Sequence, residues 1–146
     1  MQYATTSRNV PSERELRLWA RAALKARARI TVRLVGLAEG RALNRAYRGK
    51  DYATNVLTFV LNDRLPYEGD LALCAPVVSR EARAQGKDIT AHYAHLTVHG
   101  LLHLQGYEHE HDDDALEMER LETRILKRLG IADPYDRGSR PVARER

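Results

Sequence analysis

Apolar residues near the N-terminus are spaced first as in a helix and then as in a strand. The helical group recurs at intervals of one, three or four residues: Leu16, Trp19, Ala20, Ala23 and Leu24. Ser12 and Glu15 precede this group in the positions of a capping box, so we expect a helix from Ser12 to Arg29 whose apolar stripe is core. Apolar and polar residues then alternate over Ile30–Leu34, which predicts a half-buried strand.

The middle of the chain predicts one more helix and two strands. A helix is expected over Leu37–Tyr47, ending before Gly49. The nearly continuous apolar run Asn55–Leu61 predicts a buried strand, and a second short strand is expected over Asp70–Ala75. The segment Asp63–Glu68 between them contains a proline and is expected to be a connecting turn.

Three helices are predicted in the remainder of the chain. One begins at Pro76, which suits a first helical turn, and ends at Gly86. The next spans residues 89–105 and carries most of the histidines, and the last runs from the acidic residues 112–114 to Gly130. This order of elements predicts an α+β fold in a single domain, with a small mixed sheet and the 89–105 helix packed on one face.

The composition is that of an ordinary soluble domain. With 146 residues, 43% hydrophobic and 30% charged, the chain is long enough for one domain with a sizeable core. Its start lacks the apolar core of a signal peptide, and no apolar run approaches the length of a membrane span, so a cytoplasmic protein is expected. Cys74 is the only cysteine, which excludes an intrachain disulfide and a zinc site built from a cysteine cluster.

Arginine dominates the basic residues, with 20 arginines against 4 lysines in a chain of net charge +4. The planar guanidinium suits phosphate oxygens, which favours a nucleic-acid partner. A GC-rich genome that encodes arginine in place of lysine would explain the same composition, and composition does not separate the two. We expect a folded domain over residues 1–135 and a disordered basic tail over 136–146, which would be either an electrostatic arm for RNA or a solvated end.

The most specific chemistry in the chain is its group of histidines. All six lie between residues 92 and 111, and His99 and His103 are four residues apart on a predicted helix, so they share one face. Gly106 follows where a helix would end and the chain would turn back, and a third histidine comes next, either His109 or His111. Three histidines with an open fourth position are typical of a catalytic zinc site.

The same histidine spacing occurs in the metzincin zinc proteases, with one difference. Their motif has a glutamate general base directly after the first histidine. Gly100 occupies that position here, so a protease mechanism lacks its base. His92 and His95 lie upstream on the same helical face, where they would be hydrogen-bond partners of the metal ligands, residues that face the substrate, or simply polar surface.

The most specific motifs of the chain lie in three segments: His95–His109, Asn44–Phe59 and Gly69–Cys74. Together they closely resemble the YbeY family of bacterial endoribonucleases, the rRNA maturation factors. The segments keep the family's order, and the resemblance covers nearly the whole chain apart from the tail. Two positions depart from the family pattern, because Glu108 stands where aspartate is usual and Thr58 where serine is common.

The resemblance implies a fold, an activity and a set of site residues. The fold would be a four-stranded mixed sheet with about five to six helices. The metal ligands would be His99, His103 and His109, which would hold one Zn²⁺ ion per chain, and Arg48 would be the catalytic residue near the metal. The activity would be metal-dependent, single-strand-specific cleavage of RNA in ribosomal RNA processing, notably at the 3′ end of the small-subunit RNA, and in ribosome quality control.

This hypothesis gives roles to several further residues. Arg48 would stabilise negative charge that grows on the phosphate, and Lys50 would add a phosphate contact unless it is merely solvated. Tyr107 would either stack on a base or pack beneath the metal loop. Glu108 and His95 would hydrogen-bond to the metal ligands. The general base is left open between a metal hydroxide, Glu108 and the RNA 2′-hydroxyl.

Two other functions fit the same residues. The expected partners are single-stranded RNA or ribosomal RNA and the ribosome or its small subunit, with neither a membrane nor DNA. One alternative is a non-catalytic ribosome-associated assembly factor whose zinc only ties the loop after Gly106 to the helix. The other is a zinc hydrolase that acts on a substrate other than RNA.

Overall fold

The computed structural model describes residues 1–107 and 112–132 of the protein, with the backbone alone over 112–114. Glu108, His109 and His111 of the predicted site lie outside the described residues, and so does the predicted tail over 136–146. The described part contains the other predicted site residues and all of the elements that position them.

The described residues form a four-stranded mixed sheet with the strand order β1-β2-β4-β3. Its strands are β1 (Gln2–Ala4), β2 (Ala28–Val35), β3 (Val56–Asn62) and β4 (Tyr67–Cys74). The first, second and fourth run parallel, whereas β3 pairs antiparallel with β4 and forms one edge of the sheet. The predicted α+β fold with a four-stranded mixed sheet is therefore confirmed.

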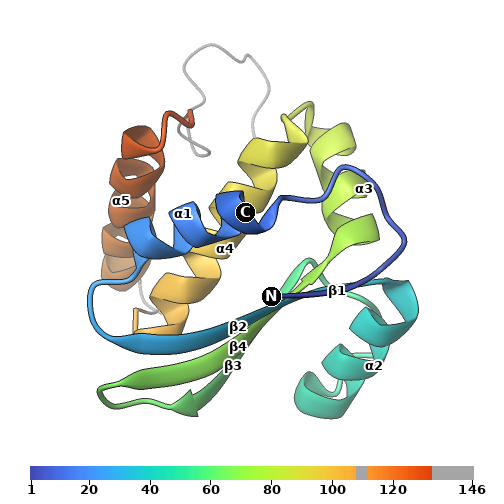
Figure 1. Ribbon diagram of the computed structural model, residues 1–146, viewed down its shortest axis with the longest axis horizontal. Helices are drawn as coiled ribbons and strands as arrows, with labels where there is room; N and C mark the ends of the chain where they lie inside the picture. The colour runs from blue at the N-terminus through green and yellow to red at the C-terminus, as the bar shows by residue number, and fades with distance from the viewer. Residues whose placement is uncertain (108–111, 133–146) are drawn as a thin grey trace.

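Helices cover both faces of this sheet (Figure 1). The described helices are α1 (Glu13–Ala23), α2 (Leu37–Arg48), α3 (Ala75–Gln85), α4 (Ile89–Leu104) and α5 (Asp112–Arg128). α1 and α4 lie over one face with α5 against α4, and the main core fills the space between them and the sheet. α2 lies on the other face, over a smaller core of Val35, Cys74 and Val77. No described helix combines the length and the apolar composition that crossing a bilayer requires.

The structure departs from the sequence predictions mainly at two element boundaries and in one strand that was not predicted. The first helix ends at Ala23 rather than Arg29, because the next residue is extended and the chain from Ala28 onward pairs with β4. β4 begins at Tyr67, inside the predicted turn, because its first residues pair with the start of β2. The sequence does not predict β1, which has only three residues and is held by parallel pairing with the far end of β2.

α4 is the central helix and lies very close to the sheet. It packs against α1, α3 and α5 as well as against β3 and β4. A Cβ atom at Gly100 of α4 would lie 2.3 Å from Leu71 Cδ1, and one at Gly69 of β4 would lie 2.4 Å from Leu104 Cδ1. These two glycines therefore allow a helix-to-sheet approach that larger residues would prevent.

Replacing Gly100 by alanine should destabilise the fold, because the new methyl group has no room beside Leu71. Alanine is the better helix former by about 1 kcal/mol, but overpacking a buried site costs more. We expect the free energy of unfolding to fall by about 1–2 kcal/mol net, measured by urea denaturation with circular dichroism. Leu71→Ala removes the obstructing side chain, so Gly100→Ala should cost less in that background. An equal loss in both backgrounds would show that the close contact is not the cause.

Candidate active site and metal centre

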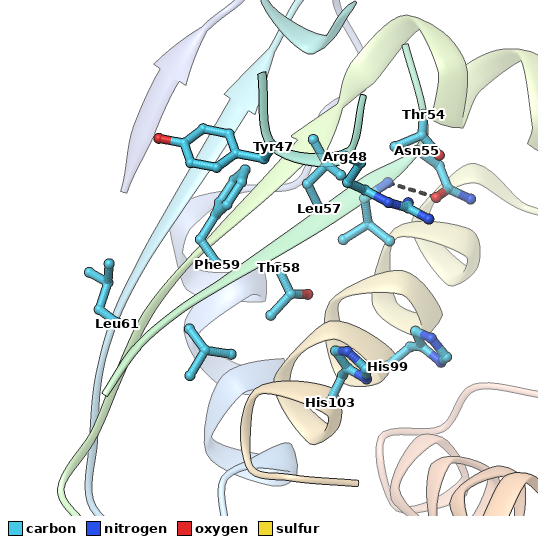
Figure 2. Close-up of a pocket in the computed structure, with 12 residues that line it drawn as sticks. Tyr47, Arg48, Thr54, Asn55, Leu57, Thr58, Phe59, Leu61, His99 and His103 are labelled. Atoms are coloured by element: carbon cyan, nitrogen blue, oxygen red, sulfur yellow. Dashed lines mark hydrogen bonds between the residues drawn. The ribbon is translucent and has the colours of Figure 1, made fainter. Parts of the chain in front are cut away.

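An open cleft of about 700 Å³ lies between the end of α2, the edge strand β3 and α4 (Figure 2). α2 contributes Tyr47 and Arg48, and α4 contributes His99 and His103. The other lining residues, 54–61, belong to β3 and to the segment directly before it. Three segments that are far apart in the sequence therefore meet around one concave surface, which is the usual setting of a binding site.

His99 and His103 lie one turn apart on α4, and both line the cleft (Figure 2). The side chain of His99 is 28% exposed, and His103 is an exposed residue. Most other positions of α4 are buried, so the core holds the helix in place and these two side chains at the cleft. Two imidazoles in this arrangement can bind one metal ion together.

A buried glutamate from α5 lies against His99. Glu122 is 0% exposed, its two carboxylate oxygens lie 3.1 and 3.2 Å from His99 Nδ1, and Oε2 lies 3.4 Å from His95 Nε2. Burial acts to raise the pKa of this carboxyl group, but hydrogen bonds and charge interactions with the two histidines outweigh burial and bring the pKa to about 2. Glu122 is therefore a carboxylate at neutral pH. Donation from His99 Nδ1 to this carboxylate would leave His99 Nε2 to face a metal ion.

His95, His99 and Glu122 form a group that could hold a metal ion. One ligand atom from each of the three lies within 4.8 Å of the others. Burial is the main influence on His95 and lowers its pKa, so its imidazole is neutral and able to bind a metal at neutral pH. The sequence instead predicts His99, His103 and His109 as ligands. Both sets share His99, and they differ in whether the ion would lie beside Glu122 or in the cleft.

Arg48 stands on the opposite wall of the cleft, at the last position of α2. The helix ends there because Gly49 adopts a left-handed conformation with φ of 69°, which favours glycine. Asn44 is fully buried and donates to the Tyr52 carbonyl at 2.7 Å, which ties the segment after α2 back to the helix. Figure 2 shows Arg48 above the two α4 histidines, so the cation and the imidazoles border the same space.

A chain of hydrogen bonds holds the segment before β3. Asn55 Oδ1 accepts from the backbone N–H of Val56 at 2.6 Å, and Asn55 Nδ2 donates to Glu81 at 3.0 Å. Glu81 also bonds to His92 Nε2 at 3.0 Å, and His92 is only 5% exposed. Burial acts to raise the pKa of Glu81, but the hydrogen bonds with His92 and Asn55 bring it below its usual value. α3 and α4 thus position one end of the cleft, and the burial of His92 excludes polar surface as its role.

Three other predicted site residues, Lys50, Tyr107 and His95, are described by the structure but do not line the cleft. Lys50 is exposed just beyond the end of α2, whereas Tyr107 is half-buried and packs against the main core. Base stacking by Tyr107 and its packing beneath the metal loop both stay predictions, because that loop lies outside the described residues. His95 contacts Glu122, and Glu108 lies outside the described residues.

Glu122 is the site residue that the sequence reasoning missed. It stands four residues after Met118 and three before Ile125, so it interrupts the apolar stripe that α5 buries. A charged residue at a core position of an amphipathic helix is a usable signal, because a buried charge requires a partner. The partners themselves come from α4 and cannot be found from spacing within α5.

The chain is similar to known proteins over nearly its whole length. The family model described as Endoribonuclease YbeY matches residues 3–130. A protein named Endoribonuclease YbeY from Nitrosomonas eutropha is 57% identical over 135 residues, which are 92% of this chain and 96% of that protein. One of the same name from Aromatoleum aromaticum is 62% identical over 125 residues, which are 86% of this chain and 81% of that protein.

A solved structure supports the fold independently. The solution structure of a protein from Thermotoga maritima matches with a TM-score of 0.51 and covers 93% of this chain and 98% of that chain. At 21% identity this likeness concerns the fold alone. The family model and the close relatives confirm the resemblance found in the sequence: the chain belongs to the YbeY family of endoribonucleases.

Proposed function

We propose that the protein is a metal-dependent endoribonuclease that cuts single-stranded RNA in the cleft between α2, β3 and α4. The observation that carries this proposal is that His99, His103 and Arg48 line one open cleft, although their helices cover opposite faces of the sheet. Membership of the family supports RNA as the substrate, because the close relatives are named endoribonucleases.

The proposed metal is one Zn²⁺ ion per chain, held by His99, His103 and His109. Imidazole nitrogens suit zinc, and Glu122 gives His99 the carboxylate partner that zinc-binding histidines commonly have. In the alternative set with His95, the same carboxylate would itself be a ligand. When bound, zinc would polarise a phosphodiester oxygen or lower the pKa of a bound water towards about 7.

The remaining residues of the cleft would bind and orient the RNA. The Arg48 guanidinium would form bidentate hydrogen bonds with phosphate oxygens and stabilise the negative charge that develops during cleavage. Glu122 would hold the His99 ring in one orientation and one tautomer. The hydrogen-bonded chain through Asn55 would keep the end of the cleft next to β3 in place.

The proposal extends to the biological substrate and its location. We propose that the RNA is ribosomal, with the 3′ end of the small-subunit RNA as the target, that the ribosome or its small subunit is the partner, and that the protein acts in the cytoplasm. The family resemblance supports this substrate. The excess of arginine, with 20 residues against 4 lysines, is consistent with repeated contacts to phosphates.

Replacing His103 by alanine should remove most of the bound zinc, because the proposed site then keeps two histidine ligands. We expect about one zinc ion per wild-type chain. The ratio of zinc to protein after dialysis would be measured by inductively coupled plasma mass spectrometry. His95→Ala should retain most of the zinc, with circular dichroism used to show that both variants fold. The reverse pattern, with zinc lost only in His95→Ala, would assign the ion to His95, His99 and Glu122.

Replacing Arg48 by glutamate should abolish RNA cleavage while zinc stays bound. Removing a donor that stabilises developing charge lowers rates by about 10²–10³-fold, and a carboxylate in its place repels phosphate. The measurement is cleavage of a fluorescent single-stranded RNA. Arg45→Glu is the matched control, because Arg45 is exposed on the same helix and does not belong to the lining of the cleft.

Each other outcome of this experiment has a definite meaning. Equal losses in the Arg45 and Arg48 variants would indicate a general effect of charge rather than a role in the cleft. Equal cleavage by the wild type and Arg48→Glu would point to a contaminating ribonuclease. A wild type that binds zinc but leaves RNA intact would favour the non-catalytic assembly factor.

A further inference from the structure

Two aromatic rings and a leucine form an exposed apolar surface at the rim of the cleft, which we call the rim patch. Tyr47 of α2 and Phe59 of β3 pack edge to face, with ring centroids 4.6 Å apart and an angle of 60° between the rings. Leu61 lies two residues after Phe59, at a register shift of β3 between Val60 and Asn62, and it also lines the cleft. Tyr47 is 68% exposed and Leu61 is 62% exposed, so the packing of Tyr47 on Phe59 leaves this patch open to water.

The rim patch lies on the other side of the sheet edge from the histidines. Consecutive residues of a strand point to opposite faces, and Thr58 lies on the α4 side, where its Oγ1 would be 3.2 Å from a Cβ at Gly100. Phe59 therefore points to the α2 side, towards Tyr47, as Figure 2 also shows. The free edge of β3 separates the two groups, and both belong to the lining of the same cleft.

The neighbours of the rim patch suggest what covers it. Tyr47 directly precedes Arg48, which lines the cleft, and the exposed Lys50 follows three residues after Tyr47 in the chain. A strand of nucleic acid has the matching chemistry, because its phosphates suit the cations and its bases present flat apolar faces to aromatic rings. A purely aliphatic partner would gain nothing from the adjacent positive charge.

We propose that Tyr47 and Phe59 form a stacking site for one base of the RNA, next to the nucleotide whose phosphate lies at Arg48. The RNA strand would cross the free edge of β3, with the phosphate on the histidine side and the neighbouring base on the rim patch. Such a site favours unpaired RNA, because a base within a duplex is already stacked and paired. This inference rests on the proposed function and adds the contact that distinguishes a single strand from a duplex.

The test compares binding of two ligands that carry the same number of phosphates. One is a short fluorescent single-stranded RNA, and the other is a stable abasic oligomer that has the sugar–phosphate chain without bases. Fluorescence anisotropy gives the dissociation constants for the zinc-loaded protein from readings taken before cleavage proceeds, and a gel of each sample measures the fraction of RNA that is still intact. Tyr47→Ala should weaken RNA binding by about 5- to 100-fold and leave binding of the abasic oligomer unchanged.

Two control variants separate stacking from other effects. Tyr47→Phe keeps the ring and should bind RNA as the wild type does. Tyr52→Ala removes a ring that is 57% exposed but lies outside the lining of the cleft, and it should have no effect. Equal losses for both ligands in Tyr47→Ala, or no loss for either, would overturn the stacking site.

Measurements on the wild type alone separate the stacking site from the proposed nuclease function. Cleavage of RNA together with equal affinity for RNA and the abasic oligomer would refute base stacking and leave the proposed nuclease function standing. A wild type that neither binds nor cuts RNA would refute the proposed function and the stacking site with it.

Discussion

The close approach of α4 to β3 and β4 is the constraint on which the site depends. Gly69 and Gly100 have no side chains, so Leu104 and Leu71 occupy the space beside them. The helix that carries the histidines therefore packs directly on the strands. His99 and His103 consequently lie beside an edge strand, and the cleft forms along that edge. The same contact explains the missing protease base, because a side chain at position 100 would have to occupy the space that Leu71 fills.

The second requirement is a buried charge. Glu122 is fully buried, and its carboxylate is stabilised by His95 and His99 rather than by water. A buried carboxylate is costly unless it is paired. Its position on the buried face of α5 is explained by its contacts with His95 and His99, which it orients. It joins α5 to α4 at the level of the proposed metal site. Removing Glu122 would take this carboxylate contact from both histidines, and removing either histidine would leave the buried carboxylate with one partner fewer.

The sequence predicts the parts of the site that depend on local pattern. The helix expected over residues 89–105 is α4 (Ile89–Leu104), and the strand expected over 55–61 is β3 (Val56–Asn62), because each carries a strong apolar signal. Contacts between distant segments are not predictable in this way. The pairing of β1 with β2 and the bond between Glu122 and His99 depend on tertiary packing. The resemblance to the family, rather than any local pattern, pointed to Arg48.

The position of the metal ion is the central claim, and anomalous X-ray diffraction at the zinc absorption edge tests it most directly. Crystals of the zinc-loaded protein should show the ion bonded to His99 and His103 in the cleft, with a coordination position open to solvent. The hydrogen bond between His99 Nδ1 and Glu122 should persist in that structure. An ion bonded to Glu122 and His95, or one closed off by four protein ligands, would contradict the account.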